Sequence, residues 1–311
     1  MSRKLRIAAA LAAVGLASSF TANAQLFRAY LSTKGNDANP CTLPAPCRLL
    51  PAALAAVAET GEIWMLDSAN YNTGPVTIDK SVTILAVPGS VGSVVSKEGN
   101  AIEVHGGASV TLRNLAIGPV AGFASAHGLV TYDTAGVSLE KSVVAGLGGT
   151  GVLAGGTSTV AILDSSIRDN ALGVEVVGGA NALLSKVVVA GHASHGLHVY
   201  GDFGNTAVAV VVDSVFEDNL NGVTATGAAG RMTKVAVTRS TATGNQANGF
   251  YARTLDNQAP LAIFELSNSI ATRNAVGLAN SQATFQSAGN NRSSGNTTSA
   301  TSGTITITAS R

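Results

Sequence analysis

The chain has 311 residues, a net charge of +1 and only 12% charged residues. It contains no basic stripe, so nucleic acid is not an expected partner. Its 35 glycines and its many β-branched apolar residues disfavour long helices and favour short strands joined by tight turns.

Residues 1–24 have the three-part pattern of a secretory signal peptide. A basic start precedes an apolar stretch over residues 7–16, and the segment ends in Ala-Asn-Ala at residues 22–24. The apolar stretch is too short to span a bilayer. We therefore expect a secreted or periplasmic protein without a membrane span, whose mature chain begins at Gln25.

The only two cysteines, Cys41 and Cys47, lie in a proline-rich segment near the mature N-terminus. An oxidising compartment favours a disulfide between them, which would close a small loop. Two thiols alone make a poor zinc site, because zinc normally takes four ligands. We expect no metal and no other cofactor.

A short helix is expected over residues 49–59, because Leu50, Leu54 and Val57 recur at helical spacing. The rest of the chain carries the repeat of a solenoid, as described below, and a solenoid exposes its core and strand edges at its ends. Such a helix would cap the first coil. The segment 61–66 is then expected to be the first strand.

The chain is accordingly divided into the signal peptide, a disulfide loop with the capping helix at residues 25–60, and a repetitive body at residues 61–311. Near the C-terminus, residues 290–303 are polar and are expected to be loose. The alternating segment 304–308 is expected to form a strand that closes the last coil.

One segment recurs through the body at intervals of roughly 20 to 28 residues. Each copy has alternating apolar residues, a polar corner, a second short strand, a turn with Asn or Gly, and a Gly before an aliphatic or aromatic residue. Three short strands per turn of this length are typical of a β-solenoid. The copies begin at Val110, Val137, Val160, Ala182, Ala209 and Val235, with weaker copies at Val76, Ile263 and Ala283.

Stacked coils place equivalent residues about 4.8 Å apart, so apolar residues should form internal columns. Asparagines in the recurring N-x-x-G turns, such as Asn170 and Asn219, should hydrogen-bond to their neighbours above and below. One internal column is expected to hold Leu112, Leu139, Ile162, Leu184, Val211 and Val237.

The repeat "G-[VLF]-x-x … V-x-[IL]-x-[ND]-[SN]-x-[IVF] … N-x-x-G" resembles that of the right-handed parallel β-helix proteins of the pectate-lyase-like superfamily, over roughly residues 76–290. Residues 35–48 also look like the opening segment of many secreted members. The resemblance implies an all-β right-handed parallel β-helix of three-strand coils, about nine to ten in number. It says little about activity, because the superfamily hosts lyases, hydrolases, epimerases, phage spikes and other proteins.

The resemblance also implies a substrate groove on the outward face of the sheet whose strands begin at the Gly-aliphatic pairs. Residues at i and i+2 of a strand share a face, which gives two outward columns. The first column contains Glu103, Val130, Leu153, Glu175, His198, Thr224 and Tyr251. The second contains His105, Tyr132, Gly155, Val177, Tyr200, Thr226 and Arg253.

Five side chains of these columns form a local cluster: Glu175, His198, Tyr200, Tyr251 and Arg253. Aromatic rings suit the apolar faces of sugars, and Arg or His suits carboxylate or hydroxyl groups. We therefore predict that this cluster binds substrate. The alternative is a solvated sheet face with ordinary polar decoration.

Three histidines spaced by three, His192, His195 and His198, lie close in sequence to Asp202. All four are possible metal ligands. The first two fall in a turn and the third on a strand, so the spacing does not imply that they converge. No metal is assigned to them.

A column at the corner between the second and third strands has charges that alternate from coil to coil. Cross-strand ion pairs with a structural role are the favoured interpretation over an acid/base site. The column is expected to contain Asn114, Lys141, Asp164, Lys186, Asp213, Arg239 and Ser267.

The catalytic patterns of the superfamily are largely missing. Polygalacturonase-like enzymes carry clustered aspartates and a Gly-His-Gly motif, and the nearest match here is residues 191–196, without adjacent aspartates. Calcium sites need several acidic residues beside a basic one, whereas Glu175 and Arg253 lie three coils apart, about 14 Å. A His198 or Tyr251 base with Arg253 neutralising a uronate is the remaining catalytic arrangement.

Two functions therefore stay open. The first is an exported, monomeric β-helix that binds a polysaccharide or a cell-surface partner, or acts as a scaffold. The second is a lyase or glycoside hydrolase acting on a uronate-containing polysaccharide. Enzymes of this kind usually wall their groove with long turns, and the short turns of this chain favour the first.

Overall fold

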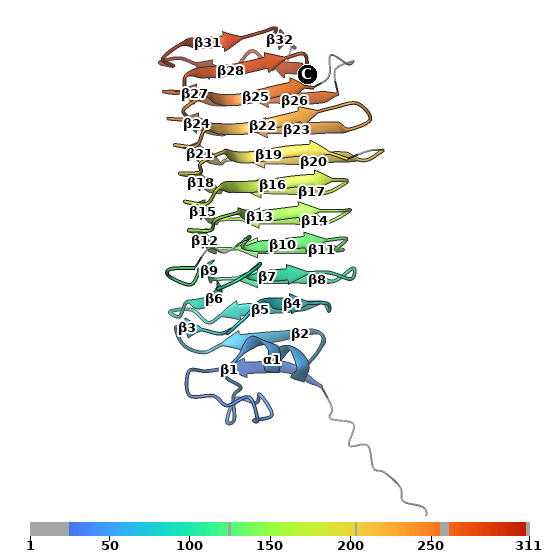
Figure 1. Ribbon diagram of the computed structural model, residues 1–311, viewed down its shortest axis with the longest axis vertical. Coiled ribbons are helices and arrows are strands. Elements are labelled where there is room, and N and C mark those ends of the chain that lie inside the picture. Colours follow the sequence, from blue (N-terminus) through green and yellow to red (C-terminus); the bar gives the residue numbers. More distant parts are fainter. Residues whose placement is uncertain (1–24, 124–125, 203, 256–260, 309–311) are drawn as a thin grey trace, which may run out of the picture.

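The chain winds into a solenoid whose strands stack along one axis, in a computed structural model that describes residues 25–123, 126–202, 204–255 and 261–308 (Figure 1). The predicted signal peptide lies outside the described residues. Each coil contributes one strand to each of three parallel sheets. The predicted all-β parallel β-helix is confirmed. No helix of the described residues has the length and apolarity needed to cross a membrane.

Sheet 1 begins each complete coil and, within the described residues, has ten strands. They are β4 (Val76–Ile78), β7 (Ile102–Val104), β10 (Leu129–Tyr132), β13 (Thr150–Gly155), β16 (Leu172–Gly178), β19 (His195–Gly201), β22 (Asn221–Gly227), β25 (Asn248–Thr254), β28 (Val276–Ser281) and β31 (Ser299–Ser302).

Sheet 2 follows sheet 1 in the coil and has twelve strands in the described part of the chain. They are β1 (Leu26–Leu31), β2 (Val57–Met65), β5 (Val82–Ala86), β8 (Ser109–Arg113), β11 (Gly136–Glu140), β14 (Thr159–Leu163), β17 (Asn181–Ser185), β20 (Thr206–Val212), β23 (Met232–Thr238), β26 (Ala262–Ser267), β29 (Thr284–Ser287) and β32 (Thr306–Ile307).

Sheet 3 completes the coil with ten short strands among the residues described. They are β3 (Ala69–Asn70), β6 (Gly92–Ser96), β9 (Leu115–Pro119), β12 (Val143–Ala145), β15 (Ser166–Arg168), β18 (Val188–Ala190), β21 (Val215–Glu217), β24 (Thr241–Thr243), β27 (Ile270–Thr272) and β30 (Arg292–Ser293).

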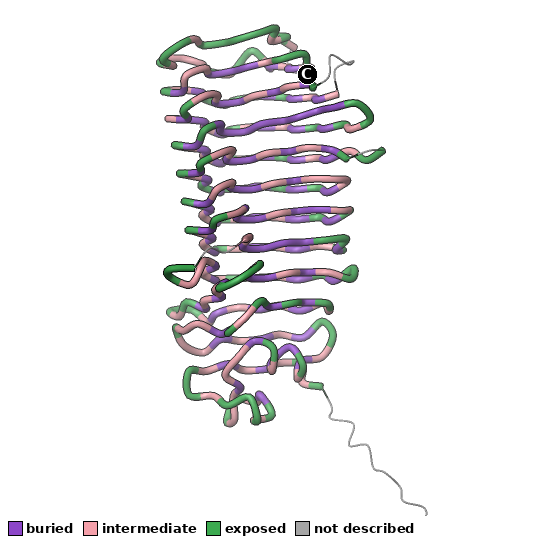
Figure 2. Tube along the Cα trace, in the orientation of Figure 1, coloured by how far each residue is buried: buried purple, intermediate pink, exposed green. Residues whose placement is uncertain are grey.

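The core fills the space between the three sheets, and buried residues recur along the strands of every coil (Figure 2). The predicted internal column is confirmed, because its six residues pair in register from β8 to β23 and are at most 2% exposed. Near the C-terminal end the neighbouring inward column, which runs through Val235, becomes aromatic. The rings of Phe264 and Phe285 stack with centroids 4.8 Å apart, and Phe250 meets Phe264 edge-on.

A single residue in the left-handed conformation turns the chain from sheet 2 into sheet 3. These corner residues have φ between +46° and +58°, and none is β-branched. The next residue is usually serine, whose Oγ accepts the backbone N–H of the equivalent residue one coil earlier, as Ser165 does from Ser142 at 3.1 Å. The observed corner column is Asn114, Lys141, Asp164, Lys186, Asp213, Arg239 and Asn268.

The turn from sheet 3 into sheet 1 is held by an asparagine ladder. Asn219 Oδ1 accepts the N–H of the residue below, and the N–H of Asn219 donates to Asn245 Oδ1 at 3.1 Å. Asn245 repeats this bond to Asn274 at 3.0 Å. The predicted hydrogen bonding between stacked asparagines is confirmed, and it satisfies backbone groups that would otherwise be buried without partners.

The glycine of the N-x-x-G turn leaves room for this ladder. A Cβ on Gly222 would lie 2.5 Å from the carbonyl oxygen of Gly249 and 3.1 Å from Asn245 Nδ2. The glycine is therefore required by the close approach of the next coil and its amide rather than by its own backbone angles.

We predict that Gly222→Ala lowers the free energy of unfolding by about 1–3 kcal/mol, because the added methyl group overpacks the ladder. Gly136→Ala is the matched control, since a Cβ there meets nothing within 4 Å. Denaturant unfolding of both variants measures the difference. Equal midpoints would contradict the packing argument.

Helix α1 (Leu50–Ala56) covers the first coil and buries Leu50, Ala53 and Leu54. The ammonium group of Lys80 donates to the carbonyl oxygens of Leu54 and Val57, which closes the C-terminal end of the helix. The predicted capping helix is confirmed but is shorter than expected, because Val57 already begins β2.

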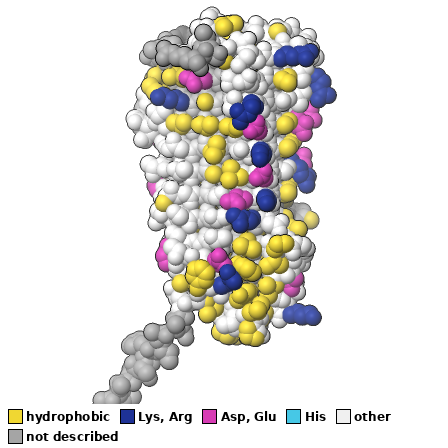
Figure 3. Space-filling model, turned by 180° about the vertical axis from the view of Figure 1, so that it is seen from behind, with side chains coloured by type: hydrophobic (Ala, Val, Ile, Leu, Met, Phe, Trp, Pro, Cys, Tyr) yellow, Lys and Arg dark blue, Asp and Glu magenta, His cyan; other side chains and the backbone are white. Residues whose placement is uncertain are grey.

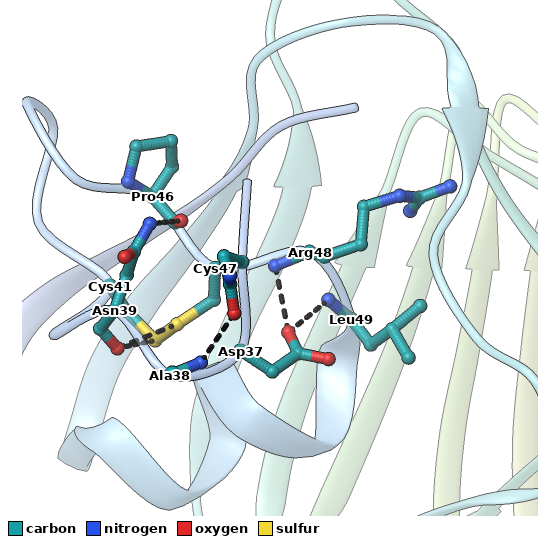
Figure 4. The surroundings of a disulfide bond; sticks show 9 residues. Asp37, Ala38, Asn39, Cys41, Pro46, Cys47, Arg48 and Leu49 are labelled. Carbon is teal, nitrogen blue, oxygen red and sulfur yellow. Dashed lines mark hydrogen bonds between the residues drawn. A yellow bond between two sulfur atoms is a disulfide. The ribbon is translucent and has the colours of Figure 1, made fainter. Parts of the chain in front are cut away.

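The predicted disulfide between Cys41 and Cys47 is present and stabilises the loop in front of α1 (Figure 4). In the same loop, Asp37 Oδ1 accepts the N–H groups of Arg48 and Leu49, both at 2.8 Å. This carboxylate satisfies backbone donors just before the helix, where no capping side chain is present at Leu49 itself.

The prediction of the first strand is wrong. Residues 61–65 are the second half of β2, and β1 pairs with β2 in parallel as an additional edge strand of sheet 2. The pattern of β1 was missed because it precedes the repeat and is separated from β2 by the disulfide loop and α1.

The register of the weaker copies was also wrong. Val76 lies in sheet 1 and pairs with Ile102, so the earliest copy begins at Val82, which pairs with Val110. At the other end, Phe264 pairs with Val235 and points inward.

The predicted copy start at Ile263 was therefore one residue too early. The predicted start at Ala283 was two residues too early, because Phe285 pairs with Phe264. Successive residues of a strand face opposite sides, so a one-residue slip exchanges the inner and outer faces. The same slip misplaced the last corner residue, which is Asn268 and not Ser267.

The C-terminal coil is more regular than predicted. Residues 290–303 contain β30 and β31, and Asn296 continues the asparagine ladder by accepting the N–H of Asn274 at 3.0 Å. The expected closing strand is present as the short β32, which pairs with β29.

Candidate functional site

The outer face of sheet 1 brings together the two predicted outward columns. In the first, Glu175, His198, Thr224 and Tyr251 pair in succession from β16 to β25. In the second, the corresponding residues are Val177, Tyr200, Thr226 and Arg253. All five predicted site residues therefore lie on one face across four consecutive coils.

An acid–imidazole pair begins this group. Glu175 Oε1 lies 3.6 Å from His198 Nδ1, an ion-pair distance slightly beyond a normal hydrogen bond. The side chains of His198 and Glu175 are only 15% and 25% exposed. His198 holds the pKa of the Glu175 carboxyl below its ordinary value, although burial opposes this. Glu175 is therefore ionised at neutral pH and orients the imidazole.

The other nitrogen of the imidazole continues into the next coils. His198 Nε2 lies 3.1 Å from Thr226 Oγ1, and Arg253 Nε donates to the same oxygen at 3.0 Å. Thr226 is only 2% exposed although it belongs to the outward column, because these two side chains fold over it. Glu175, His198, Thr226 and Arg253 thus form one continuous polar chain.

His195 stacks on this chain from the start of β19. Its ring lies 4.7 Å from that of His198, nearly parallel, and its Nδ1 is 2.9 Å from Thr224 Oγ1. Burial, together with the neighbouring His198 and Arg253, lowers the pKa of His195 to about 4. His195 is therefore neutral at physiological pH.

The two tyrosines of the site each lie beside an arginine. The Tyr251 ring centroid is 5.8 Å from Arg253 Cζ, and the Tyr200 centroid is 5.2 Å from Arg231 Cζ. Arg231 Nη1 also donates to the Tyr200 hydroxyl. Arg231 was not among the predicted site residues, and its only sequence signal was its position in one of the longer turns, residues 227–234.

The three closely spaced histidines do not converge on a metal. His192 is 1% exposed and occupies an asparagine position of the ladder. Its Nδ1 accepts the N–H of Asn170 at 3.1 Å, while its Nε2 lies 3.2 Å from the carbonyl oxygen of Ile167. No group of three or more His, Cys, Asp or Glu side chains that could hold a metal ion occurs within the described ranges.

The corner column lies away from this face, along the rear of the molecule. Seen from behind, blue and magenta side chains alternate along the axis beside an apolar stripe (Figure 3). Arg239 donates to both oxygens of Asp213, at 2.8 and 3.1 Å. Both side chains are exposed, so the pair has the structural role predicted for this column and contributes little to stability.

Burial makes His192 a source of acid sensitivity. Its pKa lies below the ordinary value of 6.5, because a buried imidazolium loses solvation, and hydrogen bonding to the backbone of Asn170 and Ile167 only partly offsets this. The unfolded chain therefore takes up this proton first as the pH falls. The stability contributed by neutral His192 is complete above pH 6.5 and decreases below it.

When the pH falls from about 7.5 to about 5, we predict that the His192→Asn variant loses less free energy of unfolding than the parent, by on the order of 1 kcal/mol. The reason is that asparagine keeps the ladder without titrating. Denaturant unfolding at both pH values measures this. His105→Asn, at a partly exposed histidine, is the control and should follow the parent. A His192→Asn variant with unchanged pH dependence would contradict the assignment.

Comparisons with known proteins agree with this fold. A family model described as "Right handed beta helix region" matches residues 100–262. The structure of pectate lyase Pel9A has a TM-score of 0.64 at 15% sequence identity, covering 83% of this chain and 76% of that chain. A sequence search of curated proteins found no match.

Two further structures are similar at lower scores. Tailspike protein 2 of Escherichia coli O157:H7 bacteriophage CAB120 has a TM-score of 0.46 and 10% identity, covering 74% of this chain and 35% of that chain. The A-module of the Azotobacter vinelandii mannuronan C-5 epimerase AlgE6 has a TM-score of 0.45 and 12% identity, covering 84% and 95%.

Proposed function

Because this chain belongs to the right-handed β-helix family, we propose that it is an exported β-helix that binds an acidic polysaccharide on the outer face of sheet 1 without cleaving it. The proposal takes the polysaccharide class from the site chemistry, and it is consistent with the pectate lyase that shares the fold. A uronate carboxylate would pair with Arg253, and the tyrosine rings would pack against the apolar faces of sugars.

The observation that carries the proposal is the polar chain that ends at Arg253. Ionised Glu175 orients His198, His198 meets Thr226, and Thr226 accepts one of the five N–H donors of Arg253. The guanidinium is thereby fixed in orientation before a ligand arrives. Preorganisation of this kind increases affinity, because less side-chain freedom is lost on binding.

The same contacts argue against catalysis by the histidines. Both ring nitrogens of His198 face oxygen partners within the protein. His195 has a pKa of about 4, far below the operating pH that suits a general base. The buried Thr226 hydroxyl is covered by His198 and Arg253, so it is a poor nucleophile for a polymer.

A uronate lyase is the second candidate. It is favoured by one observation, namely that Tyr251 lies beside Arg253 on the outer face, so a phenol and a carboxylate-binding group adjoin. In such a reaction Tyr251, as a phenolate, would remove the proton next to the carboxylate that Arg253 neutralises. The electron pair would expel the glycosidic oxygen from the neighbouring carbon, and that oxygen would take a proton from water.

We predict that the purified protein binds uronate-containing polysaccharides in preference to neutral ones, and that Arg253→Gln weakens binding about tenfold or more through loss of a charge-assisted bond. Arg239→Gln is the matched control, because Arg239 is exposed on another face. Calorimetric titration against a glycan panel measures the affinities. Equal binding by Arg253→Gln would place the site elsewhere, and unsaturated products that disappear in Tyr251→Phe would favour the lyase.

Export is the second part of the proposal and is supported by the disulfide between Cys41 and Cys47. We predict that protein recovered from the periplasm or medium begins at Gln25 and has no alkylatable thiol before reduction. Intact-mass analysis with and without reductant tests both statements. A retained N-terminal segment, or two thiols that react without reductant, would contradict them.

A further inference from the structure

A separate cleft of about 400 Å³ opens at the end of the sheet 1 strands, where they turn towards sheet 2. It lies beside the Arg253 group but does not include it. Its lining includes Tyr132, Asp133, Thr157, Val177, Tyr200 and Asp202.

Two tyrosines wall this cleft. Tyr132 and Tyr200 belong to the same outward column and are separated by three strand steps, about 14 Å. Tyr132 is 47% exposed and lies over Gly155, where a Cβ would come within 3.0 Å of its ring. The glycine lets the ring tilt along the axis towards Tyr200, and Val177 lies on the floor between them.

The described residues that line the cleft include two carboxylates and no basic side chain, and Arg231 reaches the Tyr200 hydroxyl from outside this lining. Asp133 and Asp202 contribute the carboxylates. Asp133 Oδ1 is fixed by the N–H of Thr157 at 2.8 Å and by its hydroxyl at 3.1 Å. Carboxylates accept hydrogen bonds from sugar hydroxyls but repel another carboxylate. Aromatic walls, a small floor and an acidic rim therefore suit a neutral, hydroxyl-rich sugar and disfavour a uronate.

We propose that this cleft binds a neutral sugar residue of the same polymer whose uronate is bound at Arg253, so that the ligand is a mixed acidic polysaccharide and not a homopolymer of uronate. This inference rests on the proposed function of the outer face. Val177 on the cleft floor and Arg253 are three strand steps apart, about 14 Å, which leaves room for the two or three sugar units of a single chain.

The test compares three oligosaccharides of equal length in calorimetric titrations: an all-uronate oligomer, a neutral oligomer, and a mixed oligomer that contains both. We expect the parent to bind the mixed oligomer about tenfold more tightly than the all-uronate one. Tyr132→Ala should lose about tenfold for the mixed oligomer through loss of ring stacking, and nothing for the all-uronate one. Tyr132→Phe is the control and should behave as the parent, since it keeps the ring.

The outcomes separate this inference from the proposed function. Neutral-oligomer binding that is lost in Tyr132→Ala and kept in Arg253→Gln supports the cleft as an independent subsite. A parent without preference for the mixed oligomer, or a Tyr132→Ala variant that binds it normally, overturns the inference and leaves the Arg253 site standing. Absence of binding by any oligomer overturns both. Thermal unfolding establishes that each variant is folded.

Discussion

Hydrogen bonding from one coil to the next, at a spacing of about 4.8 Å, is the constraint on which this structure depends. Every inner strand of the three sheets hydrogen-bonds through its backbone to the strands before and after it, and the turns must do the same with fewer atoms. The asparagine ladder provides this at the turn into sheet 1, as at Asn219 and Asn245. The ladder in turn requires glycine at positions such as Gly222, where any side chain would meet the amide of the next coil. The N-x-x-G pattern is therefore a single packing unit.

On the outer face of sheet 1, the same stacking brings polar side chains of successive coils into contact. Inside the solenoid, equivalent positions hold similar apolar residues, because they must fill the same space in every coil. Outside, the column positions are free to differ, and Glu175, His198 and Thr226 come from three successive coils. Their side chains reach across the strand spacing to each other and to Arg253, so threonines on the outer face are as buried as core residues. A fixed arginine on an otherwise solvated sheet is the result.

The fold and the register of its middle coils were predictable from the sequence, because inward aliphatic residues alternate there without ambiguity. The prediction was wrong where two apolar residues adjoin, as at Ile263 and Phe264, since either can be placed inside until the packing of its neighbours is known. The columns of the site followed from the same register. The contacts of the site did not follow from the register. Arg231 reaches Tyr200 from a turn, and the repeat does not specify the path of that turn. The place of His192 in the ladder could not be recognised from the sequence, because the N-x-x-G pattern has asparagine at that position.

A solenoid and a polysaccharide are both one-dimensional repeats, but this outer face is not uniform along its length. Asp133 and Asp202 border the part nearer the N-terminus, whereas Arg231 and Arg253 lie in later coils. A polymer of identical charged units would gain at one part of such a surface and lose at the other, because like charges repel where opposite charges attract. A polymer whose charge changes along its chain matches both parts in one orientation only. Under the proposed function, this asymmetry of charge would set both the composition and the direction of the polysaccharide chain that the face binds.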